Sequence, residues 1–92
     1  MNRSFSHKGL EQFFRTGTTK GTQAKHAARL RLQLARLDYA QGPNDMAAPG
    51  WKLHPLRGAL AGHWSIWVDS HGRLTFTFSE GNAEAVNYQQ YH

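Results

Sequence analysis

The sequence predicts an α+β fold of one domain, residues 1–92, in which a short N-terminal strand and two helices pack on a small antiparallel sheet. A chain of 92 residues has room for one hydrophobic core. Apolar residues recur at helical spacing in the first half of the chain and alternate with polar residues in the last third. Because short turns separate the alternating segments, we expect a meander with both helices on one face.

The first elements are short. Residues 2–5 are expected to form a strand. Ser6 is expected to cap a helix over residues 7–15, because a serine side chain accepts hydrogen bonds from the first turn. Gly17 and Gly21 bracket a polar turn after it. The apolar residues of this helix are Leu10, Phe13 and Phe14.

A longer helix is predicted over residues 23–41, with Thr22 as its cap and Gly42-Pro43 at its end. One face is apolar and packs on the sheet, and the opposite face is basic. The basic face is either merely solvated, or it attracts phosphates or an acidic partner segment. The apolar face comprises Ala27, Leu30, Leu34 and Leu37, and the basic face comprises Lys25, Arg29 and Arg36.

Residues 42–62 contain Gly-Pro, Ala-Pro-Gly and His-Pro steps and predict an ordered loop, anchored by Trp51, Leu53 and Leu56. Three strands follow, over residues 63–69, 73–79 and 85–92. The sheet face away from the helices is expected to be open, polar and basic. It carries Trp67, Arg73 and Thr75.

Charge and composition narrow the function. Eleven Lys and Arg against six Asp and Glu give a net charge of +5, which favours a polyanionic partner such as nucleic acid. The chain has no cysteine, no apolar run long enough to span a membrane and no signal peptide, so we expect a cytoplasmic protein. The acidic residues are scattered and no metal-binding spacing occurs, so neither a metal nor a cofactor is expected.

The remaining polar residues suit metal-free cleavage of RNA. That reaction needs a base for the ribose 2′-OH, an acid for the leaving 5′-oxygen and positive charge beside the phosphate. Each candidate also has a structural explanation, such as loop packing or a solvated strand position. The candidates are His54, Arg57, Arg73, Tyr91 and His92.

Several motifs together resemble the HigB family of the RelE/ParE toxin superfamily. They are Asn-Arg-Ser-Phe and His-Lys-Gly-Leu near the start, AARLRLQLARL over residues 27–37, the loop PGWKLHPLRG over residues 49–58, Arg-Leu-Thr-Phe at residues 73–76 and the terminal Tyr-His. The resemblance runs nearly end to end, and the loop and the terminus are its most specific parts.

The resemblance implies a RelE-like microbial ribonuclease fold and a toxin that cleaves mRNA in the ribosomal A site. It implies a helix-turn-helix antitoxin of the HigA type, through which alone the module would bind operator DNA. His54, Tyr91 and His92 match positions that the family uses in catalysis, and Arg73 matches a phosphate-contacting arginine. The RNA-binding residues are expected to be Lys52, Arg57 and Gln90.

One position departs from the family pattern, because Gln90 stands where the family often has aspartate. An amide accepts a hydrogen bond but takes no proton, so the base would have to be His54 or His92. Two alternatives stay open: a toxin of the same superfamily that acts on DNA gyrase, and a catalytically impaired relative that binds RNA or the ribosome.

Overall fold

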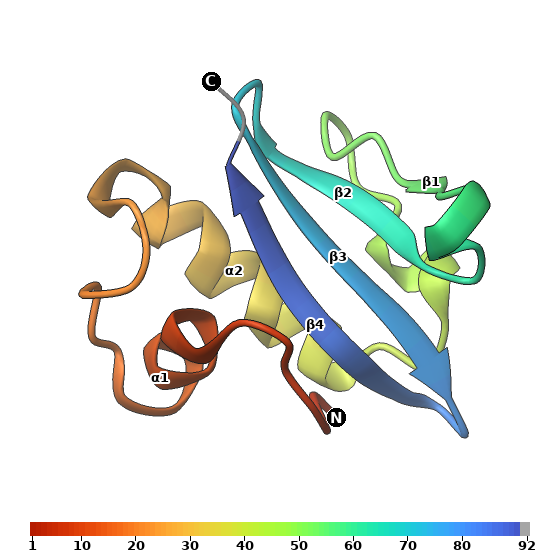
Figure 1. The fold of residues 1–92 in the computed structure, drawn as a ribbon, viewed down its shortest axis with the longest axis horizontal. Helices are drawn as coiled ribbons and strands as arrows, with labels where there is room; N and C mark the ends of the chain where they lie inside the picture. The colour runs from red at the N-terminus through yellow and green to blue at the C-terminus, as the bar shows by residue number, and fades with distance from the viewer. Residues whose placement is uncertain (91–92) are drawn as a thin grey trace.

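The computed structural model describes residues 1–90. Helices α1 (Lys8–Thr16) and α2 (Ala27–Tyr39) lie on one face of a four-stranded antiparallel sheet (Figure 1). The strands lie in chain order, as β1 (His54–Pro55), β2 (Trp64–Asp69), β3 (Gly72–Ser79) and β4 (Asn82–Gln90). The predicted α+β class and the antiparallel meander are therefore confirmed. Single 3₁₀ turns occur at Ala24–His26 (η1), Pro43–Met46 (η2) and Gly58–Leu60 (η3).

The N-terminal segment runs beside β4 but makes only two isolated parallel bridges, Asn2 with Ala83 and Phe5 with Val86 (Figure 1). The predicted strand over residues 2–5 is therefore reduced to these two contacts. Ser6 does not cap α1, because its backbone N–H still donates to the Val86 carbonyl. His7 is the N-cap instead, and its Nδ1 accepts from the Leu10 N–H at 2.9 Å.

The second helix is shorter than predicted. The tighter turn η1 precedes it, so the α-helix begins at Ala27 rather than at residue 23. Thr22 does not cap it, since its hydroxyl is buried without a partner in residues 1–90. Turn η1 carries His26, whose ring is buried under the sheet. The helix ends at Tyr39, and the extended Ala40 leads to the predicted Gly42-Pro43 break.

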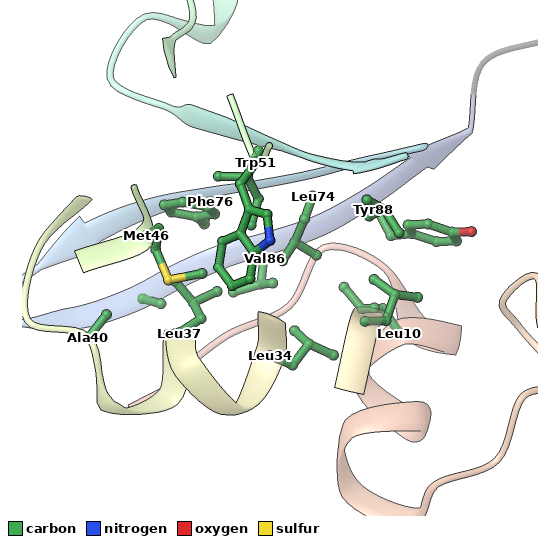
Figure 2. Packing of buried hydrophobic residues seen from close by; sticks show 14 of the residues in the cluster. Leu10, Leu34, Leu37, Ala40, Met46, Trp51, Leu74, Phe76, Val86 and Tyr88 are labelled. Carbon is green, nitrogen blue, oxygen red and sulfur yellow. The ribbon is translucent and has the colours of Figure 1, made fainter. Parts of the chain in front are cut away.

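The core forms where the two helices meet the sheet. The predicted apolar face of α2 is confirmed: Leu30, Leu34 and Leu37 are at most 1% exposed, and Ala27 packs at its edge. Figure 2 shows Leu34 and Leu37 beneath the sheet, with Leu10 of α1 beside them. The sheet contributes the alternate residues of its strands, which are Ile66, Val68, Leu74, Phe76, Val86 and Tyr88.

The loop between α2 and the sheet is ordered, and Trp51 anchors it in the core at 5% exposure. The Arg36 guanidinium lies 5.3 Å from the centre of the Trp51 ring and its Nε donates to the Asp45 carbonyl, so Arg36 fastens the loop to α2. Strand β1 was expected to be part of this loop. Instead it extends the sheet by one short edge strand, because His54 pairs with Ser65. Of the helices within residues 1–90, none has the length and apolar character that crossing a bilayer requires.

Gly9, in the first turn of α1, lies against Gly21 in the loop that leads to η1. A Cβ on Gly21 would lie 2.4 Å from the Gly9 Cα, which is closer than carbon atoms approach. We expect Gly21→Ala to lower the free energy of unfolding by about 1–3 kcal/mol, because two backbone segments would have to separate. Urea denaturation of both proteins measures the difference.

Gly42→Ala is the matched control, because a Cβ there meets no atom within 4 Å and the backbone is extended at φ −168°. It is expected to change the free energy of unfolding by less than about 1 kcal/mol. Equal stabilities for the two variants would contradict the close approach of Gly9 and Gly21.

Candidate active site

The sheet face away from the helices carries two rows of side chains that cross the strands. Both rows follow from the pairing of the strands, because residues opposite one another in a ladder point to the same face. The first, the cation row, consists of the paired residues Trp67, Arg73 and Gln89, and Lys52 joins it through contact with the Trp67 ring. The second, the histidine row, consists of His54, Ser65, Thr75 and Asn87.

Trp67 is the centre of the cation row. Arg73 lies directly opposite it on β3, and the Arg73 Cζ is 4.0 Å from the centre of the indole. Lys52 precedes β1 on the other side, and its Nζ is 3.9 Å from the same indole. Two cations from the two flanking segments therefore contact one aromatic ring.

The Arg73 guanidinium is also held by main-chain oxygens. Its Nη1 donates to the Asp69 carbonyl at 2.7 Å and to the Gly72 carbonyl at 3.0 Å. These carbonyls belong to the turn between β2 and β3, so the guanidinium is fixed against that end of the sheet. Gln89, opposite Arg73 on β4, completes the row.

His54 is the exposed end of the histidine row. Its Nδ1 is 2.9 Å from the Lys52 carbonyl oxygen, which can only accept a hydrogen bond. Nδ1 therefore carries the hydrogen in this contact, and the neutral ring presents Nε2 as a proton acceptor. A histidine in this tautomer is suited to act as a general base.

The middle of the histidine row is lined by two small hydroxyl residues. Ser65 and Thr75 lie opposite one another and are only 3% and 5% exposed. His54 and Arg73 are two strands and two residues apart, so on a regular sheet their Cα atoms are about 12 Å apart.

The other expected site residues lie elsewhere. Arg57 follows β1 and is exposed beyond both rows. Gln90 lies two residues after Tyr88 and on the same side of β4, which faces the helices. There its Oε1 accepts a hydrogen bond from the Gln23 side-chain amide, so Gln89 and not Gln90 lies opposite Arg73. Tyr91 and His92 lie outside the described residues. Within residues 1–90, no three His, Asp or Glu side chains are grouped as a metal site requires.

A buried polar network that the sequence did not suggest lies under the same end of the sheet. His26 is 2% exposed. Its Nε2 is 2.7 Å from the Asp69 carboxylate, and its Nδ1 is hydrogen-bonded to the Tyr88 hydroxyl. Its ring also fills the space beside Gly72, where a Cβ would lie 2.8 Å from it. Asp69, Gly72 and Tyr88 border the cation row, so this network supports the strands that carry Trp67 and Arg73.

The network perturbs two pKa values. Partial burial raises the pKa of the Asp69 carboxyl. This effect is outweighed by hydrogen bonds from the His71 N–H and the His26 ring and by the charges of His26 and Lys25, so the pKa of Asp69 is lowered. Burial raises the pKa of the Tyr88 hydroxyl. A hydrogen bond from the Gln23 backbone lowers this pKa in part, and the negative charge of Asp69 raises it further.

The arrangement of the strands and helices is similar to that in two solved structures. The crystal structure of YafQ from E. coli is similar over 98% of this chain and 93% of that chain, with a TM-score of 0.57 and 13% identity. The YoeB/ParE toxin from Agrobacterium tumefaciens is similar over 100% of this chain and 99% of that chain, with a TM-score of 0.58 and 19% identity. The fold is therefore that of the RelE-like toxins, as the resemblance implied.

Sequence similarity identifies the family. Residues 3–92 match the model for RelE-like toxins of the type II toxin-antitoxin system HigB. Endoribonuclease HigB from Proteus vulgaris is 40% identical over 92 residues, which is the full length of both chains. The chain belongs to the HigB-like toxin family, and a toxin of a type II module has an antitoxin partner.

Because the pKa of Asp69 is lowered on folding, its contribution to stability is present above its ordinary pKa of 3.8 and is lost as the pH falls through the lowered value. We expect Asp69→Asn to lower the Tm at neutral pH and to lower it progressively less below pH 3.8. Thermal unfolding followed by circular dichroism over this pH range measures the difference.

Glu80→Gln is the control for loss of one carboxylate, since the Glu80 side chain is exposed and makes no hydrogen bond or ion pair within residues 1–90. Its Tm should follow that of the wild type at every pH. A deficit for Asp69→Asn that is the same at all pH values would refute the charge-dependent role of Asp69.

Proposed function

We propose that this toxin is a metal-independent endoribonuclease that cleaves mRNA on the ribosome, in the cytoplasm, by attack of a ribose 2′-OH on the adjacent phosphate. The name of the Proteus vulgaris relative, Endoribonuclease HigB, supports this activity. The observation that carries the proposal is the placement of His54 and Arg73 on one open sheet face, with His54 in a tautomer that offers Nε2 as base.

Each residue then has one role. His54 Nε2 takes the proton of the 2′-OH, and Arg73 binds the phosphate as negative charge develops on its oxygens. Lys52 and Arg57 contact the neighbouring backbone phosphates, whereas Gln90 is bonded to Gln23 on the helix side of β4, away from this face. We assign to His92 the donation of a proton to the leaving 5′-oxygen, and to Tyr91 the orientation of the substrate or help with that transfer, because both match positions that the family uses in catalysis.

The direct test is to incubate the purified toxin with programmed ribosomes and to map the mRNA ends by primer extension. We expect new ends with the parent toxin. His54→Ala and Arg73→Ala are each expected to lower the cleavage rate by about 10²–10³-fold, because one removes the base and the other removes the charge on the phosphate.

Arg29→Ala is the control for loss of a cation, since Arg29 is exposed on α2 on the far side of the core, and it should cleave at the rate of the parent. Absence of new ends with the parent, or undiminished cleavage by Arg73→Ala, would reject the proposal. Inhibition of gyrase supercoiling without mRNA cleavage would assign the chain to the alternative activity instead.

The antitoxin is proposed to be a helix-turn-helix protein of the HigA type that contacts the exposed basic residues at the start of α2. Lys25 of η1 and Arg29 of the first turn of α2 are exposed and lie four residues apart. Arg36 was expected to share this face, but it is engaged with Trp51 and Asp45 and serves the fold. Opposite charge on the partner would speed association and fix its orientation.

The double charge reversal Lys25→Glu with Arg29→Glu is expected to weaken antitoxin binding about ten-fold or more at low salt, because attraction becomes repulsion. Calorimetric titration of the purified toxin with the antitoxin at two salt concentrations measures the change. Lys8→Glu with Lys20→Glu makes the same change of charge at exposed positions outside α2. If the two double variants lose the same affinity, only net charge matters, and this surface is not the interface.

A further inference from the structure

The open sheet face brings two positive side chains, Lys52 and Arg73, against one aromatic ring. Lys52 and Arg73 contact the same indole at 3.9 and 4.0 Å, which places their charged groups within about 8 Å of each other. Like charges at this distance repel, so something must hold them. In the cation row, the residue between them is Trp67.

An aromatic ring is suited to this position. The face of an indole carries partial negative charge and attracts a cation, yet it has no net charge to neutralise it. A carboxylate at the same place would form ion pairs with both side chains and would compete with a phosphate for them. The indole therefore contacts two cations without itself neutralising their charge.

The backbone makes the arrangement specific. The Trp67 N–H donates to the Trp51 carbonyl at 2.6 Å, which ties the segment carrying Lys52 to β2. Lys52 itself has a left-handed backbone with φ 52°, a conformation that lysine seldom adopts. On the other side, Arg73 is held by the carbonyls of Asp69 and Gly72. Both stems are thus fixed before any ligand arrives.

We propose that Trp67 is a positioning residue of the RNA site, whose indole holds Lys52 and Arg73 as a pair that binds one stretch of RNA backbone phosphate. The inference rests on the proposed function and adds a residue to it. Trp67 takes no part in proton transfer. It acts through the two cations, by reducing the number of orientations that each must lose when the phosphates bind.

The test compares Trp67→Phe with Trp67→Leu. We expect Trp67→Leu to lower kcat/KM for ribosome-dependent mRNA cleavage by about 10–100-fold, since the cations are no longer held in place. Trp67→Phe keeps an aromatic face and should stay within about three-fold of the parent. With fewer phosphate contacts, the slope of log(kcat/KM) against log salt should fall by about one for Trp67→Leu.

A double-mutant cycle tests whether the residue acts through its neighbour. Lys52→Met should lower kcat/KM clearly in the parent and little in the Trp67→Leu background, because the lysine is already misplaced there. Trp64→Leu is the structural control. Trp64 is three residues earlier on β2 and packs against the core, so its replacement should lower the Tm and leave the salt slope unchanged.

Three outcomes would overturn the inference: parental kcat/KM and salt slope in Trp67→Leu, equal loss in Trp67→Phe and Trp67→Leu, or additive effects of Lys52→Met and Trp67→Leu. Failure of the proposed function is distinguished by Arg73→Ala. If Arg73→Ala cleaves like the parent, the proposed function itself fails. If Arg73→Ala loses cleavage while Trp67→Leu keeps it, only the role of Trp67 is refuted.

Discussion

The register of β2 against its two neighbours is the constraint on which the site depends. A slip of one residue would turn Trp67 into the core and bring Ile66 to the open face. Burial prevents the slip, because Ile66 is fully buried in the core, and so does the hydrogen bond from the Trp67 N–H to the Trp51 carbonyl. The same pairing that closes the core therefore aligns the cations on the other face.

The buried histidine has a related role at the end of the sheet. A polar ring without partners in the core would cost several kcal/mol, but both nitrogens of His26 are engaged, by Asp69 and Tyr88. These partners come from β2 and β4, and the ring packs on Gly72 of β3. One side chain of η1 thus joins the three long strands where the shift in register after Trp67 would otherwise loosen them.

Local patterns were sufficient to predict the faces of the elements. The spacing of Leu30, Leu34 and Leu37 predicted the buried side of α2, and the alternation around Arg73 predicted its open face. The prediction that Ser6 caps α1 was wrong because the Ser6 backbone is hydrogen-bonded to Val86, and a local sequence pattern cannot predict a contact between residues so far apart in the chain. His26 was missed for the same reason, since its partners are brought to it only by the assembled sheet.

The composition explains why an aromatic residue stands between the cations. The chain has eleven Lys and Arg and only six acidic residues. Of the acids, Asp69 is bonded to His26, and Glu84 pairs with Arg3. Among residues 1–90, no acidic side chain belongs to the two rows of the open face. A scarcity of carboxylates favours the binding of a polyanion, because each carboxylate added to the site would reduce the positive electrostatic potential at the phosphate. Holding the cations with the face of Trp67 keeps that field while giving them a defined place.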